Sequence, residues 1–279
     1  MKVNYPHPNN YDLELNLYTR VLKLKSLHWG YWLKKDILTV ENLFKAQQRY
    51  TQKIIENIPN GVHTILDVGA GIGDNAIALS KSGFKVVALS PEPTQKEIFQ
   101  EISKKNRDIS FVLSKYEDFS SKDKFDLILM SESSNYFPLK AGAKQSERYL
   151  KQGGFVLTIG LFRKTNSPEY SEWNVASDFE KEYKQNGFRL LKKIDVTDRV
   201  TPSMDLAYKY YQDYVPPFLE IISNYYQKAF KIKAKLLALI FRKEIKFLNT
   251  LVTKVLPERL DVKKYKKFGR YYLYLFQLT

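Results

Sequence analysis

A glycine-rich turn is the part of the sequence whose residue types and spacing point most directly to chemistry. The segment Asp67-Val68-Gly69-Ala70-Gly71-Ile72-Gly73 follows the apolar run Thr64–Val68 and precedes an amphipathic run that begins at Asp74. Glycine permits a tight turn and a close approach of the backbone to a ligand. A strand is expected before the turn, a helix after it, and a second strand that ends about 20 residues later at Leu89. This context predicts a ligand-binding turn.

The elements that position this turn follow from an alternation along the chain. From Thr64 onward, short runs rich in Val, Ile, Leu and Phe alternate with longer polar or amphipathic stretches. This alternation is typical of an α/β fold in which helices cover a parallel sheet. We expect seven strands, at Thr64–Val68, Lys85–Leu89, Ile109–Leu113, Phe125–Met130, Phe155–Gly160, Phe188–Val196 and Arg270–Leu278. Helices are expected between them, at Asp74–Ser82, Pro93–Lys105 and Ala141–Leu150.

Four parts of the chain are predicted from this pattern. Residues 1–60 form an N-terminal helical cap, in which Thr39–Ile58 is one helix with its first residue near the N-cap. Residues 61–200 form the α/β core, and residues 268–279 supply its last strand. Residues 201–267 are too long for a structureless loop and are predicted to be an inserted helical lid.

The glycine turn resembles motif I of the class I S-adenosylmethionine-dependent methyltransferases. Two other segments agree: Phe125–Leu129 resembles their fourth-strand motif, and Leu150–Leu157 resembles the turn before their fifth strand, with Gln152 in place of the usual proline. The resemblance covers Thr64–Gly160. It implies a Rossmann-like, doubly wound, mostly parallel sheet with an antiparallel last strand. It also implies S-adenosylmethionine as cofactor and S-adenosylhomocysteine as product.

One departure from the family pattern indicates which branch of the family the chain resembles. Most of these methyltransferases end the second strand with an acid that holds the ribose, and this chain has Ala88 there. A neutral residue at this place, the segment Lys115–Phe119 and the aromatic segment Leu27–Trp32 resemble the branch of cyclopropane-fatty-acid synthases and tocopherol-type small-molecule methyltransferases.

The resemblance implies a set of cofactor contacts. Asp67 is expected to orient the glycine loop or the amino group of the ligand, and Ser90, Glu92 or Gln95 to replace the ribose acid. Tyr116 and Glu117 are expected beside the adenine, and Tyr11 and Tyr31 in a segment that closes over the cofactor. The full predicted set is Tyr11, Tyr31, Asp67, Gly69, Ala70, Gly71, Gly73, Leu89, Ser90, Gln95, Tyr116, Glu117 and Ser131.

Methyl transfer from a sulfonium makes modest demands on the protein. It is an in-line displacement, so the acceptor, the methyl carbon and the sulfur must be aligned in a dry pocket. An acceptor that carries a proton also needs a base within hydrogen-bond reach. The candidates are Glu132 and Tyr136, which follow the fourth strand at the ligand-binding edge of the sheet, and His28. An exposed loop acid and a packed ring explain Glu132 and Tyr136 equally well.

Composition excludes several kinds of site. The chain of 279 residues has no Cys and three His, at positions 7, 28 and 63, far apart in sequence. Thiolate metal sites, disulfides and cysteine nucleophiles are therefore excluded, and no metal site is expected.

The substrate and partners are predicted from aromatic content and charge. The aromatic N-terminal segment and the inserted helices suit a hydrophobic small-molecule or lipid-like acceptor. The net charge is +15, and Lys228–Lys267 holds 13 Lys and Arg against 3 acids. A basic amphipathic helix there can contact an anionic membrane peripherally, although a solvated lysine face packed on the core is slightly favoured.

Other functions remain as alternatives. An RNA or DNA methyltransferase would suit the basic charge, but the chain has no Asn-Pro-Pro-Tyr motif and no RNA-binding module, so nucleic acid is not the expected partner. A non-catalytic S-adenosylmethionine-binding subunit is compatible with Ala88. A nicotinamide-dependent oxidoreductase has a different glycine spacing.

The expected location is cytoplasmic, with a peripheral position at the inner membrane surface as the variant. The N-terminal residues have no apolar core of signal-peptide length, and no run of about 18 apolar residues occurs. The acceptor atom, the pathway and the oligomeric state are left open.

Overall fold

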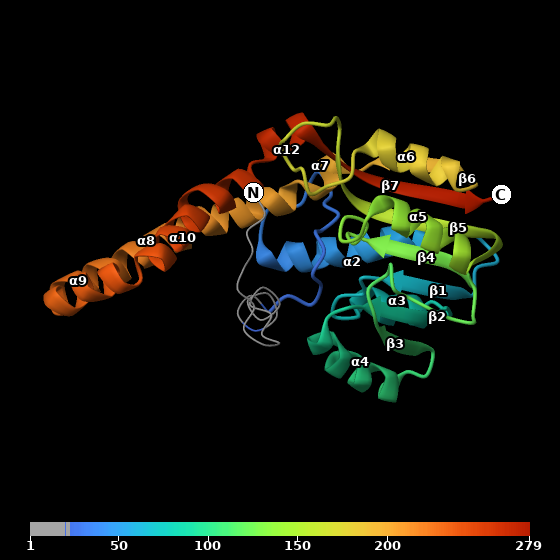
Figure 1. Ribbon diagram of the computed structural model, residues 1–279, viewed down its shortest axis with the longest axis horizontal. Coiled ribbons are helices and arrows are strands. Elements are labelled where there is room, and N and C mark those ends of the chain that lie inside the picture. Colours follow the sequence, from blue (N-terminus) through green and yellow to red (C-terminus); the bar gives the residue numbers. More distant parts are fainter. Residues whose placement is uncertain (1–19, 21–22) are drawn as a thin grey trace.

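A seven-stranded sheet lies at the centre of the molecule (Figure 1). The structure, a computed structural model, describes residue 20 and residues 23–279, apart from the side chains of residues 234, 235 and 237. All seven predicted strands are present. They are β1 (Thr64–Val68), β2 (Lys85–Ser90), β3 (Ile109–Leu113), β4 (Phe125–Ser131), β5 (Leu150–Arg163), β6 (Phe188–Asp195) and β7 (Gly269–Leu278).

The strand order is β3-β2-β1-β4-β5-β7-β6. Strands β1 to β5 pair in parallel, whereas β7 lies antiparallel between β5 and β6. The predicted Rossmann-like sheet with an antiparallel last strand is confirmed. The chain leaves β1 toward β2 and β3 on one side and returns to β4 and β5 on the other. In such sheets ligands bind outside the carboxyl ends of the strands where the direction changes, here at β1 and β4.

Helices cover both faces of the sheet, so the doubly wound prediction is also confirmed. One face packs against α2 (Val40–Glu56), α3 (Asp74–Lys81) and α4 (Pro93–Lys105), and the other against α5 (Leu139–Tyr149) and α6 (Ala176–Gln185). Alternate residues of β7 enter the two cores, because side chains of a strand alternate between its faces. Tyr271, Leu273 and Leu275 join the first core, and Tyr274 and Phe276 join the second.

The helix α2 begins where its cap was expected. The hydroxyl of Thr39 accepts a hydrogen bond from the backbone N–H of Asn42 at 3.2 Å. This bond satisfies one of the amide groups that the first helical turn leaves without a partner. The helix carries Gln47, Tyr50 and Thr51, all buried, onto the sheet near the glycine turn.

The segment between β6 and β7 is helical, as predicted, but its shape is that of an arm and not of a lid. In Figure 1 α8 runs outward from the core, α9 lies farthest away and the later helices return. A lid would bury its inner side against the core, and the residues of α8 that are buried, Ser203, Met204 and Leu206, all lie at its root. The helices of this segment are α7 (Thr197–Val200), α8 (Pro202–Ala229), α9 (Lys231–Ile240), α10 (Arg242–Thr250), the π-helix η2 (Leu251–Val255), α11 (Leu256–Leu260) and α12 (Val262–Phe268).

None of the described helices combines the length and the apolar character that crossing a membrane would need.

Candidate active site

The glycine turn lies at the carboxyl end of β1, and its three glycines all have left-handed backbone angles. The φ angles are +75° at Gly69, +57° at Gly71 and +86° at Gly73. A Cβ on Gly69 would lie 2.5 Å from the Cβ of Ser133, and one on Gly73 would lie 2.6 Å from a methyl group of Ile102. Gly71 has more room, since the nearest described atom to its Cβ position is Cδ1 of Leu27 at 3.5 Å.

The turn is fixed to the end of the second strand. The backbone N–H groups of Gly69 and Ala70 both donate to the carbonyl of Leu89, at 2.8 and 3.2 Å. The buried Ser90 follows, and its hydroxyl accepts a hydrogen bond from the N–H of Glu92 at 3.2 Å. The structure thus brings the predicted residues of β1, the turn and β2 to one place.

Among the described residues several buried oxygen atoms have no hydrogen-bond partner, and two of these come from β1 and α4. They are Oδ2 of Asp67 on β1 and Oε1 of Gln95 on α4, and both side chains are more than nine-tenths buried. Burial, together with the negative charge of Asp74, raises the pKa of Asp67 to about 7. Leaving a buried acceptor unpaired is costly, so both atoms indicate a ligand that donates hydrogen bonds.

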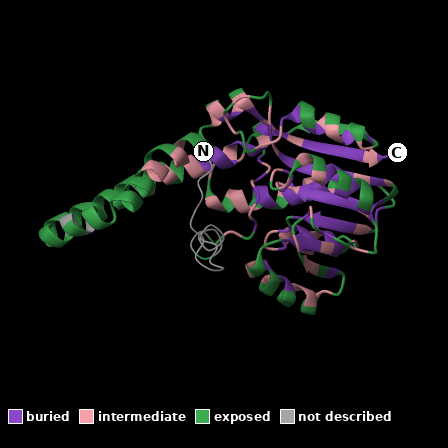
Figure 2. Cartoon of the chain, viewed as in Figure 1, coloured by how far each residue is buried: buried purple, intermediate pink, exposed green. Residues whose placement is uncertain are grey.

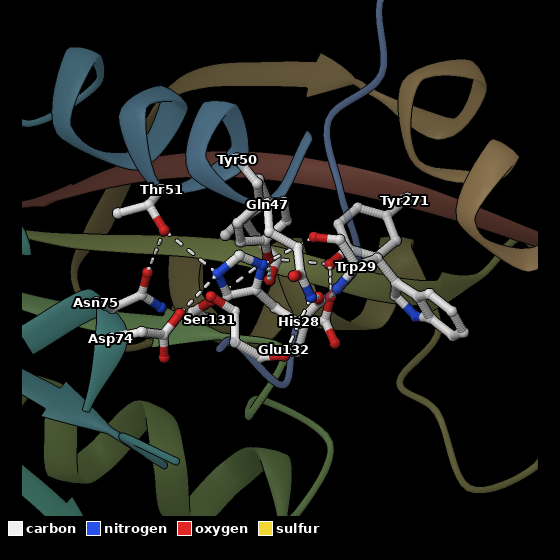
Figure 3. A network of polar contacts seen from close by, with 12 residues as sticks. His28, Trp29, Gln47, Tyr50, Thr51, Asp74, Asn75, Ser131, Glu132 and Tyr271 are labelled. Carbon is white, nitrogen blue, oxygen red and sulfur yellow. Dashed lines mark hydrogen bonds and ion pairs between the residues drawn. The ribbon is translucent and has the colours of Figure 1, made fainter. Parts of the chain in front are cut away.

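A buried polar network links the segment 26–32 to this edge of the sheet (Figure 3). Nδ1 of His28 lies 2.8 Å from the carbonyl oxygen of Trp29, and Nε2 lies 3.0 Å from a carboxylate oxygen of Asp74. The ring stacks on Tyr50 at 4.1 Å. A carbonyl and a carboxylate only accept, so both ring nitrogens carry a proton. The hydroxyl of Thr51 donates its proton to the side-chain oxygen of Asn75. It therefore accepts a hydrogen bond from the Nε2–H of His28.

The charge of His28 follows from this environment. Burial by itself lowers the pKa of the imidazole, but the hydrogen bond and charge of Asp74 and the charge of Glu132 outweigh it, so the pKa is raised. A ring with both nitrogens donating has no lone pair for a substrate proton. The geometry therefore does not support His28 as a general base. It supports a role in fixing the segment 26–32 over α3.

Glu132 lies at the centre of the second half of the network. It follows β4 directly, and its φ of +58° is rare for a residue with a side chain. Its Oε1 accepts hydrogen bonds from the N–H of Trp29 at 3.0 Å and from the hydroxyl of Tyr271. Tyr271 in turn contacts the hydroxyl of Tyr50 at 2.9 Å, which lies 3.3 Å from that of Ser131.

The carboxyl group of Glu132 is tuned toward its neutral form. Burial raises its pKa, and the charge of His28 and the hydrogen bonds from Tyr271 and Trp29 offset this only in part. The backbone of Glu132 lies against Gly160 of β5, where a Cβ would be in van der Waals contact with the Cα of Glu132 at 3.4 Å. A buried carboxyl held in a strained backbone beside a ligand-binding turn is typical of a catalytic group.

Comparisons with known proteins agree with this geometry. Residues 65–154 match the sequence model of a family described as a methyltransferase domain. These residues include the glycine turn, the end of β2 and Glu132. This part of the core is therefore similar to a methyltransferase domain. No curated protein sequence matches the chain.

Solved structures share the fold at low sequence identity. Geranyl diphosphate C-methyltransferase from Streptomyces coelicolor A3(2), in complex with Mg²⁺, geranyl diphosphate and S-adenosyl-L-homocysteine, aligns with a TM-score of 0.68 and 14% identity over 97% of this chain and 94% of that one. The cyclopropane synthase MmaA2 from Mycobacterium tuberculosis gives 0.63 and 15%, with 90% of each chain covered. The [4+2]-cyclase SpnF gives 0.66 and 16%, over 94% and 92%.

The structure offers groups that match S-adenosylmethionine, the cofactor that the sequence resemblance implies. The ligand carries an ammonium group and ribose hydroxyls, which are donors, and the unpaired oxygens of Asp67 and Gln95 are acceptors. The open side of Gly71 leaves space for the ligand against the backbone. Ala88 is fully buried in the core below α3 and α4, so the chain has no acid at that position to hold the ribose.

Of four other predicted cofactor contacts, three lie among the described residues and one does not. The ring of Tyr116 is buried against α5, where its hydroxyl contacts Ser146 at 3.0 Å. Glu117 beside it is half-buried. Tyr31 packs on α2, with its N–H bonded to the carbonyl of Ala46 at 2.8 Å. Tyr11 lies outside the described residues.

Tyr136, predicted as a catalytic residue, lies in the turn that follows β4. Its side chain is 83% exposed, and its N–H bonds to the carbonyl of Ser133 at 3.0 Å. A catalytic role for Tyr136 stays a prediction.

Several aromatic residues near Glu132 were not predicted as site residues. Tyr50 and Tyr271 come from α2 and β7, and Trp29 from the aromatic N-terminal segment. Tyr170 and Trp173 stack at 4.2 Å in the loop after β5, and Tyr265 of α12 packs edge-on against both. The hydroxyl of Tyr265 is buried without a hydrogen-bond partner among the described residues. The alternation in β7 placed Tyr271 on one face, but nothing in the sequence paired it with Glu132. Among the described residues no cluster of His, Asp and Glu could hold a metal ion.

Asp67 gives a testable pH dependence. Its pKa of about 7 in the folded protein, against an ordinary value near 3.8, means that the carboxyl is mostly protonated at pH 5.5 and mostly ionised at pH 7.5. If the ionised form holds the ammonium group, S-adenosylhomocysteine is expected to bind about 20-fold more weakly at pH 5.5 than at pH 7.5. Isothermal titration calorimetry at both values measures this, and Asp67→Asn is expected to bind weakly with no such dependence.

The same shift fixes the sign of a stability effect. Between pH 4 and pH 7 the folded protein holds a proton on Asp67 that the unfolded chain has released, so this group lowers stability as the pH rises through that window. Asp67→Asn is therefore expected to be at least as stable as the wild type at pH 7.5. A variant that is less stable there and still binds with the wild-type pH dependence would contradict the assigned role.

Proposed function

We propose that this methyltransferase domain transfers the methyl group of S-adenosylmethionine to a hydrophobic small-molecule or lipid-like acceptor that binds against Glu132. The observation that carries the proposal is a buried carboxyl at the end of β4, next to the cofactor turn and surrounded by aromatic residues. Aromatic walls favour an apolar ligand, and one carboxyl supplies a polar contact that orients it. The geranyl diphosphate bound in one of the similar structures supports this class.

In this proposal different residues bind the cofactor, accept the proton and position the carboxyl group. The bound cofactor supplies an electrophilic methyl group. Asp67 and Gln95 hold its ammonium group and a ribose hydroxyl, and the glycine turn lets it approach the backbone. Glu132, whose pKa is raised by burial, takes the proton that the acceptor loses. Tyr271 and the N–H of Trp29 position its carboxyl, and the segment 26–32 excludes water from the edge of the sheet.

Three other residues predicted from the sequence are also assigned roles in the proposal. Ser131 borders the site through its contact with Tyr50, and Leu89 and Ser90 fix the turn at the cofactor side. A cytoplasmic location and a peripheral contact of Lys228–Lys267 with an anionic membrane are also part of it. The basic charge of that segment supports the membrane contact.

The proposal is tested by a transfer assay. Purified protein is incubated with S-adenosyl-[methyl-³H]methionine and a panel of isoprenoid, fatty-acyl and aromatic acceptors, with short RNA as the comparison class. Labelled product is expected from a hydrophobic acceptor and not from RNA. Labelled RNA would overturn the acceptor class. Binding of S-adenosylhomocysteine without transfer to any acceptor would favour a non-catalytic subunit.

A further inference from the structure

The helical arm formed by residues 202–268 leaves an unusual amount of apolar surface uncovered. In the described part of the chain 24 large apolar side chains are exposed, and 17 of them lie between Tyr210 and Leu248. Figure 2 shows that most of the outer arm is exposed. Several are more than half exposed, among them Phe218 at 61% and Ile232 at 85%. Contiguous apolar surface of this kind marks an interaction site in a folded protein.

The exposed residues follow the helical period on both limbs of the arm. On α8 they recur at Tyr210, Tyr214, Phe218 and Tyr225, and on α9 at spacings of three and four residues: Ile232, Leu236 and Leu239. Residues three and four apart lie on one face of a helix, so each limb carries a continuous apolar stripe. Such stripes are kept where a partner covers them.

The outer end of the arm is much more basic than the limb that leads out to it. Residues 228–246 contain seven Lys and Arg and one acid, Glu244, whereas residues 205–227 contain three acids and one Lys. The outer end, with α9, is also the part that Figure 1 shows at the greatest distance from the sheet. Two copies of such an end would bring like charges together. A surface with negative charge above an apolar interior complements it.

We propose that the outer part of the arm, residues 218–248, binds the surface of an anionic lipid bilayer. The apolar stripes enter between the headgroups, and the lysines contact the phosphates. This deepens the membrane part of the proposed function and rests on it.

The arm is rooted beside the candidate active site. It begins after β6, which runs parallel to β5, and ends at Gly269, which pairs with Arg163 at the carboxyl end of β5. At the root, Ser203 Oγ accepts hydrogen bonds from the N–H of Gly30 and the indole N–H of Trp32, at 3.0 and 2.8 Å. Membrane contact through the arm would therefore hold the edge that binds the acceptor on the membrane side of the core.

Vesicle co-sedimentation tests the charge component. The wild type is expected to bind phosphatidylglycerol vesicles and not phosphatidylcholine vesicles, with affinity falling as salt rises. Each basic residue near an anionic surface contributes roughly fivefold, so K231Q/K233Q/K243Q should bind about 100-fold more weakly. The matched control K96Q/K105Q/K181Q removes three exposed lysines of the core and should bind like the wild type.

The apolar component needs its own variant. I232S/L239S should bind phosphatidylglycerol vesicles at least about tenfold more weakly. The control I37S removes an apolar side chain that is 73% exposed on the core, and it should bind unchanged. Circular dichroism and calorimetric binding of S-adenosylhomocysteine are measured on every variant. Both must match the wild type, so that a change in vesicle binding is not a change in folding.

Three results would overturn the inference. In the first, the wild type does not bind phosphatidylglycerol vesicles at low salt. In the second, the arm variants bind vesicles as well as their controls do. In the third, duplex DNA retains the protein as well as vesicles do. A dimer in light scattering that I232S/L239S abolishes, without vesicle binding, would assign the arm to a second copy of the chain. Failure of S-adenosylhomocysteine binding alone would count against the proposed function and not against the lipid contact.

Discussion

Glu132→Gln is expected to lower kcat/KM for methyl transfer by about 10²- to 10⁴-fold. The amide keeps the size of the side chain and its acceptor oxygen for the N–H of Trp29, but it cannot take a proton. Affinity for S-adenosylhomocysteine should stay within about twofold, because Asp67, Gln95 and the glycine turn are unchanged. The measurements are steady-state kinetics with the acceptor found in the transfer assay, and calorimetry for the product.

The pH dependence of activity distinguishes a catalytic role of Glu132 from a purely structural one. The pKa of Glu132 is raised by burial, so wild-type activity should fall on the acid side as the carboxyl gains its proton. That limb should be absent in Glu132→Gln and retained in Tyr271→Phe, which removes one of the hydrogen bonds that position the carboxyl. Glu147→Gln, at an exposed glutamate, serves as the matched control. A loss of activity in Glu132→Gln below threefold would contradict the catalytic assignment.

Gly69→Ala is expected to be the most destabilising of the single changes considered, by about 2–4 kcal/mol. The left-handed backbone costs an alanine about 1 kcal/mol, and the new Cβ would lie 2.5 Å from the Cβ of Ser133. Overpacking of this kind costs about 1–3 kcal/mol more. Chemical denaturation gives the free energy of unfolding, and S-adenosylhomocysteine binding should weaken with it.

Two further variants divide this cost into its parts. Gly83 has a φ of +92° and no atom within 4 Å of its Cβ position, so Gly83→Ala measures the backbone cost alone, about 1 kcal/mol. The double variant G69A/S133G removes the clash and should recover part of the loss relative to the two single variants. Equal destabilisation by Gly69→Ala and Gly83→Ala would show that the turn relaxes and that Ser133 does not restrict it.

Local patterns in the sequence were enough to predict the scaffold. Runs of β-branched and aromatic residues gave all seven strands, and the order of strand, glycine turn and helix gave the cofactor edge with Asp67 and Leu89 in place. In the last predicted strand, β7, Tyr271 and Phe276 enter opposite cores, because side chains of a strand alternate between its faces. These predictions succeed because backbone periodicity and glycine conformations depend on neighbours in sequence.

Pairings between distant residues could not be predicted in this way. Glu132 was a candidate without partners, and the fold supplied Trp29 from 103 residues before it and Tyr271 from 139 residues after it. The sequence made His28 a candidate base, but in the structure its two ring nitrogens contact the carbonyl of Trp29 and the carboxylate of Asp74. Tyr136 follows Glu132 by four residues in sequence, yet its side chain is exposed whereas the carboxyl group of Glu132 is buried.

The inserted helices also show which features are local in sequence and which depend on tertiary contacts. Helical periodicity and charge between residues 201 and 267 are properties of the sequence, and they predicted helices with a basic, apolar character. Whether those helices fold back over the site or extend from it depends on contacts at the root, such as those of Ser203 with Gly30 and Trp32. The sequence by itself determined the elements and the cofactor turn, which are local. The tertiary structure alone decided which side chains meet at Glu132 and where the arm points, because those contacts join residues far apart in the chain.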